Sequence, residues 1–437
     1  MPNGARLDPQ SAVVVGAGII GVCCAYALRR SGFEVLLVEK DEPGQAASFG
    51  NSGSIGLAST PPLGLPGMLK DVPRMLMDPR HALVLRWRYL PRSLPWLLKF
   101  ARTLDPARVE AISAARANLL SHAGGAYEDL LSEIGHSELI YPSGLIFAYE
   151  SEGSFRGARY GIELRRRTGV EVQEMSGNTL REIEPALSER AAQGFYLPAV
   201  RTTTSPLALT RSILAAYRAR GGKLVHATVR RFERGPEGVC AVETDQGRHL
   251  CDLAVVAAGA WSRDLAKQFG DRIPLAAERG YHIEVEDPPA KPAVPIVSGD
   301  RNVSMTMIEG NLRMTTMAEF AAIDAPPDHE RALRLFRAAA GLIRDLEVKA
   351  ASRWIGSRPS TPDSLPVIGR SPRCPNLFYA FGHGHLGLTF GAVTGRLVAQ
   401  LARGDRPNID IGPYRPGRDY TGAHLFESAV ERPGAAR

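Results

Sequence analysis

The chain has 437 residues, of which 44% are hydrophobic and 23% charged; this is typical of a globular protein too long for one hydrophobic core, so we expect two domains. The net charge is +7, but the basic residues are mostly arginines interleaved with acids, which excludes a nucleic-acid-binding stripe and favours a mild attraction for anions. The five cysteines are odd in number, scattered and without metal-ligand spacing, so the sequence predicts no disulfide framework, no metal site and a reducing cytoplasm.

A strand–turn–helix–strand unit is predicted near the start of the chain, in AVVVGAGIIGVCCAYALRRSGFEVLLVEK (12–40). A buried strand at 12–15 leads into the motif G-x-G-x-x-G at 16–21, a helix runs to about Arg30, and a second strand at 35–38 ends at Glu39. The motif in this context is the fingerprint of dinucleotide binding.

The residues of the fingerprint have separate predicted roles. Gly16 permits the tight turn, Gly18 lets the backbone approach a pyrophosphate, and Gly21 allows the helix to pack closely on the strand. The helix N-terminus then faces the phosphates with free N–H groups and a positive dipole end. Glu39 is expected to accept hydrogen bonds from the adenosine ribose, and its charge argues against a 2′-phosphate. The predicted contacts are Gly16, Gly18, Ile19, Ile20, Gly21 and Glu39.

The same segment has a competing interpretation. Residues 11–28 carry no charge and follow Arg6, as does the apolar part of a signal peptide or a membrane span. The three glycines and the acidic end of the second strand favour dinucleotide binding instead. For Cys23 and Cys24, on the predicted helix, core packing is favoured over redox chemistry.

A loop follows in DEPGQAASFGNSGSI (41–55), which is too polar for a strand and too rich in glycine for a helix. It is either a plain connector or a loop that returns its backbone N–H groups to the phosphates or to a flavin ring. The candidate cofactor contacts in this region are Lys40, Ser48, Asn51, Ser52 and Gly53.

With the Rossmann unit followed by S-F-G-N-S-G-S-I, the chain resembles flavoproteins of the D-amino-acid oxidase superfamily over about residues 11–420, and is most similar to the D-amino-acid dehydrogenase branch. The resemblance implies an α/β fold with a Rossmann-type FAD-binding domain and a discontinuous substrate domain of antiparallel sheet plus helices. We expect the FAD-binding domain at 1–60, 203–272 and 354–437, and the substrate domain at 61–202 and 273–353.

In the segment 61–105, Trp, Tyr, Leu and Phe alternate with Arg and Lys, a composition that suits a membrane-interface surface. The alternative is a set of short helices that cover the substrate domain. We favour this alternative because the prolines prevent one long amphipathic helix. If the chain passes electrons to a quinone, the membrane interpretation gains weight.

Helices and strands alternate through the middle of the chain. We expect a long helix at 107–135, a strand at 144–148, a basic helix at 155–168, a strand at 170–172 and a short helix at 178–187. Thr204 or Ser205 is expected to cap the next helix, because a proline follows at the first helical turn. Further along we expect a helix at 206–220, strands at 223–227, 239–244 and 249–251, and a buried strand from 252 that runs into AAGAWS at 257–262.

Two segments of this region are candidate cofactor contacts. By the resemblance, Val229 gives its backbone N–H and C=O to the adenine. The small residues that follow the buried strand let a ligand approach closely, as at the carboxyl edge of a doubly wound sheet; a routine strand-to-helix turn is the alternative. The candidates there are Ala258, Gly259 and Trp261.

Period-2 alternation at 273–318 predicts an antiparallel sheet with one face toward a ligand, and a helix is expected at 325–349. Tyr281 and Arg313 are secondary candidates for contact with the substrate, and Arg279 is a weaker one. Strand register decides which of these side chains face inward.

The last third of the chain contains G-S-R-P at 356–359, and a strand at 377–381 followed by the Gly/His loop (382–389) and a helix at 391–402. Because the Gly/His loop opens a helix, its N–H groups and dipole can face the flavin N1–O2 edge or the ribityl chain, and the corresponding loop of the superfamily holds the flavin there. The candidates are Gly384, His385, Leu386, Gly387, Leu388 and Thr389. His383 and His385 either lie near the ring or only cap and pack.

Arg358 is the candidate clamp for a substrate carboxylate. A guanidinium offers two parallel N–H bonds, and the resemblance places Arg358 at the superfamily's carboxylate-binding G-x-R-P arginine; a salt bridge is the alternative. His383 completes the candidate catalytic set of Arg358, Tyr281, Arg313 and His383. No acid–base triad is evident, and hydride transfer to a flavin does not demand one. No signature of covalent attachment is present, so FAD is expected to bind noncovalently.

The sequence and the resemblance together predict FAD-dependent oxidative deamination of a D-amino acid, such as D-proline or D-hydroxyproline, by hydride transfer to flavin N5. The D configuration rests on the resemblance alone. The alternatives are a glycine- or sarcosine-type amine oxidase, and an FAD-binding subunit of a heteromeric dehydrogenase. The expected electron acceptor is a quinone or an electron-transfer protein, and the expected location is the cytoplasm, with contact to the inner face of the membrane through 61–105 as an open alternative.

Overall fold

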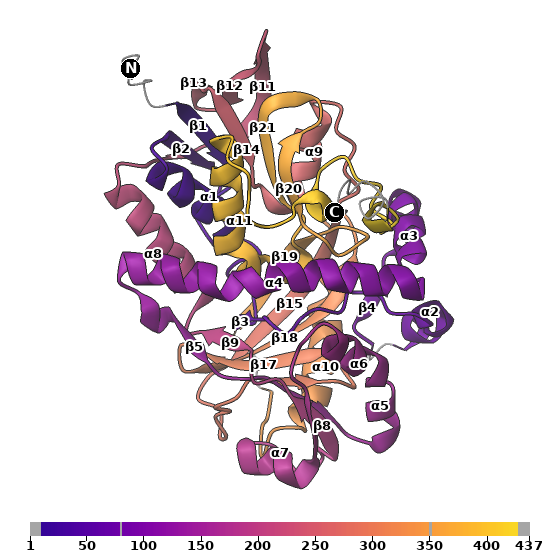
Figure 1. Cartoon of the computed structure of the whole chain (residues 1–437). Helices are drawn as coiled ribbons and strands as arrows, with labels where there is room; N and C mark the ends of the chain where they lie inside the picture. The colour runs from indigo at the N-terminus through magenta and orange to yellow at the C-terminus, as the bar shows by residue number, and fades with distance from the viewer. Residues whose placement is uncertain (1–9, 79–80, 349–351, 427–437) are drawn as a thin grey trace, which may run out of the picture.

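The computed structural model of the chain describes residues 10–78, 81–348 and 352–426. Figure 1 shows a parallel sheet with its helices in the upper part, a larger sheet in the lower part, and the long helix α4 (Pro106–Ile134) across their boundary. The Asp105 side chain accepts the N–H of Arg108 at the start of α4, and Gly135, with a φ of 75°, ends it. The helix predicted at 107–135 is confirmed.

The upper sheet has the doubly wound arrangement that the fingerprint predicts. Its first five strands run parallel and the sixth is antiparallel to its neighbour, in the order β10, β2, β1, β14, β21, β20. Their bounds are β10 Lys223–His226, β2 Glu34–Glu39, β1 Ser11–Val15, β14 Leu253–Val256, β21 Cys374–Phe381 and β20 Val367–Ser371. The α/β fold class is confirmed, because a parallel sheet of this kind accompanies a separate, mainly antiparallel sheet.

Both faces of the parallel sheet are covered. The helices α1 (Ile19–Arg30), α8 (Pro206–Ala219) and α11 (Gly387–Ala402) share one apolar core with it. On the other face lie α9 (Ser262–Lys267) and the antiparallel sheet β11 Val229–Gly235, β12 Gly238–Thr244 and β13 Gly247–Leu250. Burial on both faces explains why the sequences of β1 and β14 are nearly continuous runs of apolar residues.

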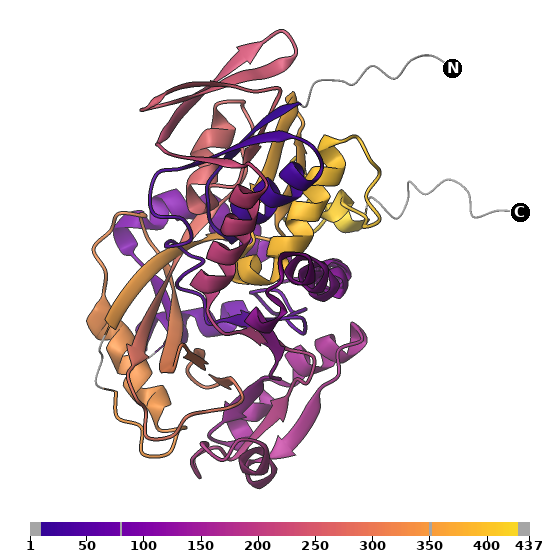
Figure 2. The same cartoon turned by 90° about the vertical axis from the view of Figure 1, so that its left-hand side faces the viewer.

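The lower sheet has nine strands, in the order β19, β15, β18, β17, β16, β6, β8, β7, with β4 paired to β18. Figure 2 shows this sheet below the parallel sheet, with α4 seen nearly end-on between them. The bounds are β19 Ser352–Ser360, β15 Ala276–Val285, β18 Asn311–Phe320, β17 Val303–Ile308, β16 Ile296–Ser298, β6 Ile146–Tyr149, β8 Gln193–Tyr196, β7 Gln173–Ser176 and β4 Leu83–Leu85. β19 belongs to this sheet although it lies in the segment 354–437 expected in the FAD-binding domain; the domain division stays a prediction.

Several predicted elements differ from those observed. The basic helix expected at 155–168 is two helices, α5 (Glu152–Arg156) and α6 (Arg159–Arg167). The strand expected at 170–172 is wrong: Val172 packs into the core without pairing with another strand, and β7 begins at Gln173. The helix expected at 325–349 is α10 (His329–Ala340), which starts only after Asp328 caps it; residues 349–351 lie outside the described chain. The helix expected from 391 begins at Gly387 as α11.

The segment 61–105 forms separate short elements rather than one helix. They are α2 (Met68–Met77), β4, the 3₁₀ turn Trp87–Tyr89 and α3 (Leu90–Thr103). The segment 11–28, which also resembled a membrane span, forms β1 and most of α1 in the core of the parallel sheet. Among the described residues, no helix combines the length and the apolar character needed to cross a membrane.

The remaining elements are short. They are β3 Ser54–Ile55, β5 Ile140–Pro142, β9 Arg201–Thr203, α7 Gly177–Ile183 and the 3₁₀ turns Ser137–Leu139, Gly259–Trp261, Gly384–Leu386 and Gly412–Tyr414. β3, β9 and β5 form a small antiparallel sheet beside the cavity described below.

Candidate active site

One large cavity lies between the parallel sheet and the nine-stranded sheet. Its volume is about 1110 Å³, at or above the upper end of the ~300–1,000 Å³ range of ordinary ligand pockets. The walls come from the β1–α1 turn, the loop 46–56, β19 and the Gly/His loop, together with α2 and α3. The cavity therefore joins the dinucleotide fingerprint to the G-S-R-P strand, segments that lie more than three hundred residues apart.

The β1–α1 turn has the close packing that its three glycines predict. Gly16 has a φ of +103°, and a Cβ there would lie 2.6 Å from the Ala257 carbonyl oxygen. A Cβ on Gly21 would lie 1.7 Å from the Gly16 carbonyl oxygen, so Gly21 lies behind the turn and not on the cavity wall. Gly18 begins α1 without a side-chain cap, which leaves the N-terminus of α1 open to the cavity.

The end of β2 lies at the same edge of the cavity. The Glu39 carboxylate accepts the N–H of Ala17 at 2.6 Å and the N–H of Lys40 at 2.9 Å. The Lys40 ammonium lies 4.6 Å from the centre of the Trp261 ring, and both residues line the cavity. The predicted contacts Gly16, Gly18, Ile19, Ile20, Glu39, Lys40, Val229, Ala258, Gly259 and Trp261 all line the cavity.

The loop 46–56 is held by two hydrogen bonds that its own side chains accept. The Ser48 hydroxyl accepts the N–H of Ile19 at 2.9 Å, which ties the loop to the start of α1. The Asn51 side chain accepts the N–H of Gly53 at 2.9 Å, and Gly53 has a φ of +82°. Ser48, Asn51 and Ser52 line the cavity, whereas Gly53 does not.

Arg313 holds this loop from behind. It is 2% exposed, donates to the carbonyls of Phe49 at 2.7 Å and Asn51 at 3.0 Å, and forms an ion pair with Glu284 at 2.5 Å. Every branch of its guanidinium is engaged and it does not line the cavity. The candidate role of Arg313 in binding substrate is therefore not supported, and its geometry is that of a loop anchor.

Tyr281 also lies outside the cavity. Its hydroxyl donates to Glu319 at 2.6 Å and accepts the N–H of Asp328 at 2.9 Å. Burial and the hydrogen bond to Glu319 raise the pKa of Tyr281 to about 12. Gly280, its neighbour on β15, lines the cavity, so Tyr281 faces the opposite side of the strand and its candidate role in binding substrate is not supported. Arg279 is likewise held on that side by Glu319, at 3.5 Å.

The Gly/His loop forms a 3₁₀ turn at Gly384–Leu386 that runs directly into α11. Gly384, His385, Leu386, Gly387 and Leu388 line the cavity; Thr389 does not, because its hydroxyl turns inward and accepts the N–H of Gly56 at 2.9 Å. A backbone bridge joins Ser360 at the end of β19 to His383 at the start of the loop.

His383 lines the cavity from a buried position. Its Nε2 atom lies 3.0 Å from the Thr394 hydroxyl, and its Nδ1 atom has no hydrogen-bond partner among the described residues. Burial lowers the pKa of His383 to about 3, so the ring is neutral at physiological pH. A neutral ring with one unsatisfied nitrogen suits contact with a polar ligand atom.

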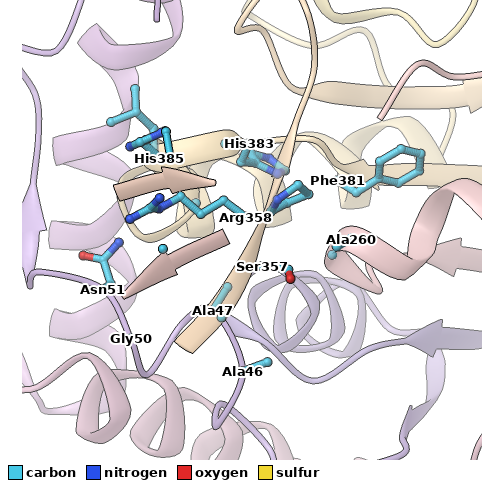
Figure 3. Close-up of a pocket in the computed structure, with 18 of the residues that line it drawn as sticks. Ala46, Ala47, Gly50, Asn51, Ala260, Ser357, Arg358, Phe381, His383 and His385 are labelled. Carbon is cyan, nitrogen blue, oxygen red and sulfur yellow. The ribbon is translucent and has the colours of Figure 1, made fainter. Parts of the chain in front are cut away.

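Arg358 extends along the cavity from β19, and Figure 3 shows its guanidinium end directed toward His385 and Asn51. Its Nη1 donates to the Met317 carbonyl at 2.7 Å and to Glu278 at 3.2 Å. Its Nη2 and Nε atoms make no hydrogen bond to another described residue, so this edge of the guanidinium is available to a ligand. A Cβ on Gly280 would lie 2.2 Å from Nη2, which shows that this glycine makes room for the fork.

Glu278, which was not among the residues predicted from the sequence, is fully buried next to Arg358. Its Oε1 accepts from His385 Nε2 at 2.6 Å and from Arg358, and its Oε2 accepts the Ser360 hydroxyl at 2.7 Å. A carboxylate on a strand of otherwise buried residues needs such partners, and that was the available signal. Trp354 was also missed: its ring lines the cavity, and a Cβ on Gly50 or Gly356 would overlap it, at 1.9 and 2.0 Å.

These features are those of a dinucleotide-binding enzyme in which one cavity joins the nucleotide fingerprint to the strand that carries the Arg358 guanidinium. Residues 11–401 match the family described as DAO, FAD dependent oxidoreductase, and the chain belongs to this family. FAD fits the observed cavity, because the open N-terminus of α1, Glu39, Val229 and the Gly/His loop all lie on its wall.

Known proteins of similar sequence cover nearly the whole chain. The D-amino-acid oxidase of Bradyrhizobium diazoefficiens is 38% identical over 425 residues, which is 96% of this chain and 100% of that protein. The D-amino acid dehydrogenase 2 of Mesorhizobium japonicum is 29% identical and covers 91% of this chain and 97% of its own length. The glycine oxidase structure from Geobacillus kaustophilus has a TM-score of 0.72 with 22% identity, over 94% of this chain and 99% of that one, and shows a shared fold.

Proposed function

We propose that this enzyme oxidises a D-amino acid to the corresponding imino acid, with FAD bound noncovalently along the cavity. The observation that carries the proposal is the free edge of the Arg358 guanidinium, which faces the cavity that also contains the nucleotide fingerprint. The 38% identical relative that bears the name D-amino-acid oxidase supports the choice of substrate class.

The guanidinium of Arg358 suits a carboxylate better than the ammonium of a lysine, which acts as a single point charge. Two parallel N–H groups on one edge of a guanidinium match the two oxygens of a carboxylate. Met317 and Glu278 hold the other edge, so little side-chain freedom is lost when a ligand binds. Bound in this way, an amino acid has its Cα fixed relative to the Gly/His loop, to which β19 is joined by the Ser360–His383 bridge.

The described residues also suit a noncovalent cofactor. Cys23, Cys24, Cys251 and Cys374 are buried, and none of the cysteines lines the cavity. When bound, FAD supplies the acceptor for the hydrogen and the two electrons that leave the substrate Cα. The protein supplies placement: a clamp for the carboxylate, a neutral His383, and a cavity wall of glycine-rich turns together with apolar and aromatic side chains.

The function is tested by anaerobic titration of the purified, FAD-loaded protein with D-alanine, D-proline, D-hydroxyproline, their L enantiomers, glycine and sarcosine. We expect at least one D-amino acid to bleach the flavin absorbance, with its L enantiomer inactive. Bleaching by glycine or sarcosine alone would establish the amine-oxidase alternative instead. No bleaching by any of them would contradict the proposal and favour an FAD-binding subunit that depends on partner chains.

We propose a quinone or an electron-transfer protein as the electron acceptor. Mixing the anaerobically reduced protein with a quinone or with oxygen distinguishes between these electron acceptors. Rapid return of the flavin absorbance on mixing with a soluble quinone, with little peroxide formed in air, is the expected result. Stoichiometric peroxide at the turnover rate would show an oxidase and overturn this part of the proposal.

We also propose peripheral contact with the inner face of the cell membrane through α2 and α3. Several large apolar side chains of this segment are exposed, among them Met77 at 78% and Trp87 at 72%. Exposed basic side chains accompany them, which suits an anionic lipid surface. The exposed residues are Leu69, Met77, Trp87, Leu94 and Leu98, with the basic residues Lys70, Arg88, Arg92 and Arg102.

A vesicle-flotation experiment tests this contact. The protein is expected to float with vesicles rich in anionic lipid at low salt, and to release them as salt screens the charges. Trp87→Ser together with Met77→Ser should reduce the floated fraction severalfold and leave FAD content unchanged, because neither residue lines the cavity. An equal floated fraction for this variant, or no flotation of the wild-type chain, would contradict the contact.

A further inference from the structure

Glu278 holds two cavity residues through a single oxygen atom. His385 Nε2 lies 2.6 Å and Arg358 Nη1 3.2 Å from the same Oε1. The two side chains therefore lie next to each other, as Figure 3 shows, although they come from the Gly/His loop and from β19. An α-amino acid carries its carboxylate and its amine on one carbon atom, so a ligand clamped by Arg358 presents its amine within the same small region.

The charge of Glu278 decides which nitrogen of His385 carries a proton. Burial raises the pKa of Glu278, but the contacts of its carboxylate with His385, Arg358 and the Ser360 hydroxyl outweigh burial and lower it, so the carboxylate is ionised. An ionised carboxylate only accepts hydrogen bonds, so Nε2 of His385 carries a hydrogen. Whenever the ring carries one proton, its lone pair is therefore on Nδ1, for which no hydrogen bond to a described residue exists. The side chain is 46% exposed and lines the cavity.

We propose that His385 is the proton acceptor for the substrate ammonium group and that Glu278 is the positioning residue that aims it; this inference rests on the proposed function. The amine of an amino acid is protonated at neutral pH, and a hydride leaves Cα readily only when the nitrogen lone pair is free. An N–H bond of the ammonium breaks, and its proton forms a bond to Nδ1 of His385. The Cα hydrogen then leaves with the electron pair of its bond as a hydride, which bound oxidised FAD would accept, while the nitrogen lone pair forms the C=N bond.

After the proton transfer, each charged group of the site has a partner of opposite charge. The imidazolium of His385 is paired with the Glu278 carboxylate, while Arg358 is paired with the substrate carboxylate. The second histidine of the Gly/His loop does not compete for the proton. His383 is neutral, because burial lowers its pKa to about 3.

The experiment compares anaerobic flavin reduction by a D-amino acid in the wild-type chain and in His385→Gln, from pH 6 to pH 10. At neutral pH the variant should be slower by about 100-fold, at the lower end of general-base contributions. The difference in reduction rate between the wild type and the variant should shrink as pH rises, because the free amine form of the substrate becomes available from solution. A deficit of the same size at every pH would overturn the inference, since a merely structural defect does not depend on the substrate's protonation.

Glu278→Gln tests the positioning role. A glutamine can donate to Nε2 and so place the ring hydrogen on Nδ1, where it blocks proton transfer. We expect the same deficit that recovers at high pH, and a Glu278→Gln/His385→Gln double variant no slower than either single variant, because the two residues act as one unit. If the double variant loses as much rate as the two single variants together, the positioning role of Glu278 is overturned. His122→Gln, the same change on the outer part of α4, is the matched control and should leave reduction unchanged.

A binding measurement separates this role from collapse of the pocket. A short carboxylate without an amine, such as propionate, should perturb the flavin spectrum of His385→Gln with the wild-type Kd, because Arg358 is intact. A Kd raised tenfold or more, or loss of FAD, would mean that His385 only supports the site, and the inference fails. If the wild-type flavin is not reduced by any D-amino acid at any pH, the proposed function fails as well; reduction of the wild-type chain with a constant deficit in the variant overturns the inference alone.

Discussion

Replacing Arg358 by alanine is expected to raise the KM for the D-amino acid by about 100-fold while FAD stays bound. Each hydrogen bond between charged groups contributes ~1.5–3 kcal/mol, and the free edge of the guanidinium offers two of them. The variant also removes the Arg358 cation from the buried Glu278 carboxylate, which adds to the cost of binding an anion nearby. Steady-state kinetics with the substrate identified by flavin bleaching give the measurement.

Two further variants make the result specific. Arg358→Lys retains the charge without the fork and should give a KM between those of the wild type and Arg358→Ala. Arg353→Ala removes an arginine of the same strand whose exposed side chain reaches Glu330 at 3.5 Å, and it should behave as the wild type. An unchanged KM in Arg358→Ala, with normal FAD content, would remove Arg358 from the binding site.

Replacing Gly21 by alanine is expected to abolish FAD binding. The added methyl group would lie 1.7 Å from the carbonyl oxygen of Gly16, and because that atom belongs to the backbone, α1 must move away from the turn. The displaced helix no longer presents its N–H groups at the phosphate position. The measurements are FAD content after purification, released by heat as expected of a noncovalent cofactor, and the rise in Tm on adding FAD.

A control glycine shows whether the effect belongs to this position. Gly125 lies on α4 with nothing within 4 Å of its Cβ position, so Gly125→Ala should bind FAD normally and gain up to about 1 kcal/mol of stability. Equal loss of FAD in both variants would point to general instability. Full FAD binding by Gly21→Ala would contradict the close packing on which the cofactor site depends.

The nucleotide half of the site is predictable from sequence because its signals are local. The glycines of the β1–α1 turn, the acid at the end of β2 and the small residues after β14 occur within short segments, and the structure brings them to one cavity edge. Arg358 was found for the same reason, from the four residues G-S-R-P.

The substrate half depends on pairing between distant strands. β15 alternates regularly along its ladder with β19, but most of its residues are buried on both faces, so the alternation alone does not reveal which side faces the cavity. Tyr281 and Arg279 meet Glu319 on the far side, while Glu278 and Gly280 face Arg358. Glu278 becomes meaningful only when His385, 107 positions away, is folded against it.

The bridge between Ser360 and His383 bears on how a substrate enters. The chain just after it is held by the Asp363–Arg418 ion pair, at 2.7 Å and without solvent exposure, so β19 and the Gly/His loop are tied together at this end of the cavity. We therefore expect any movement that admits a substrate to occur elsewhere on the cavity wall, where Leu69 of α2 and Leu98 of α3 lie both against the cavity and in contact with solvent.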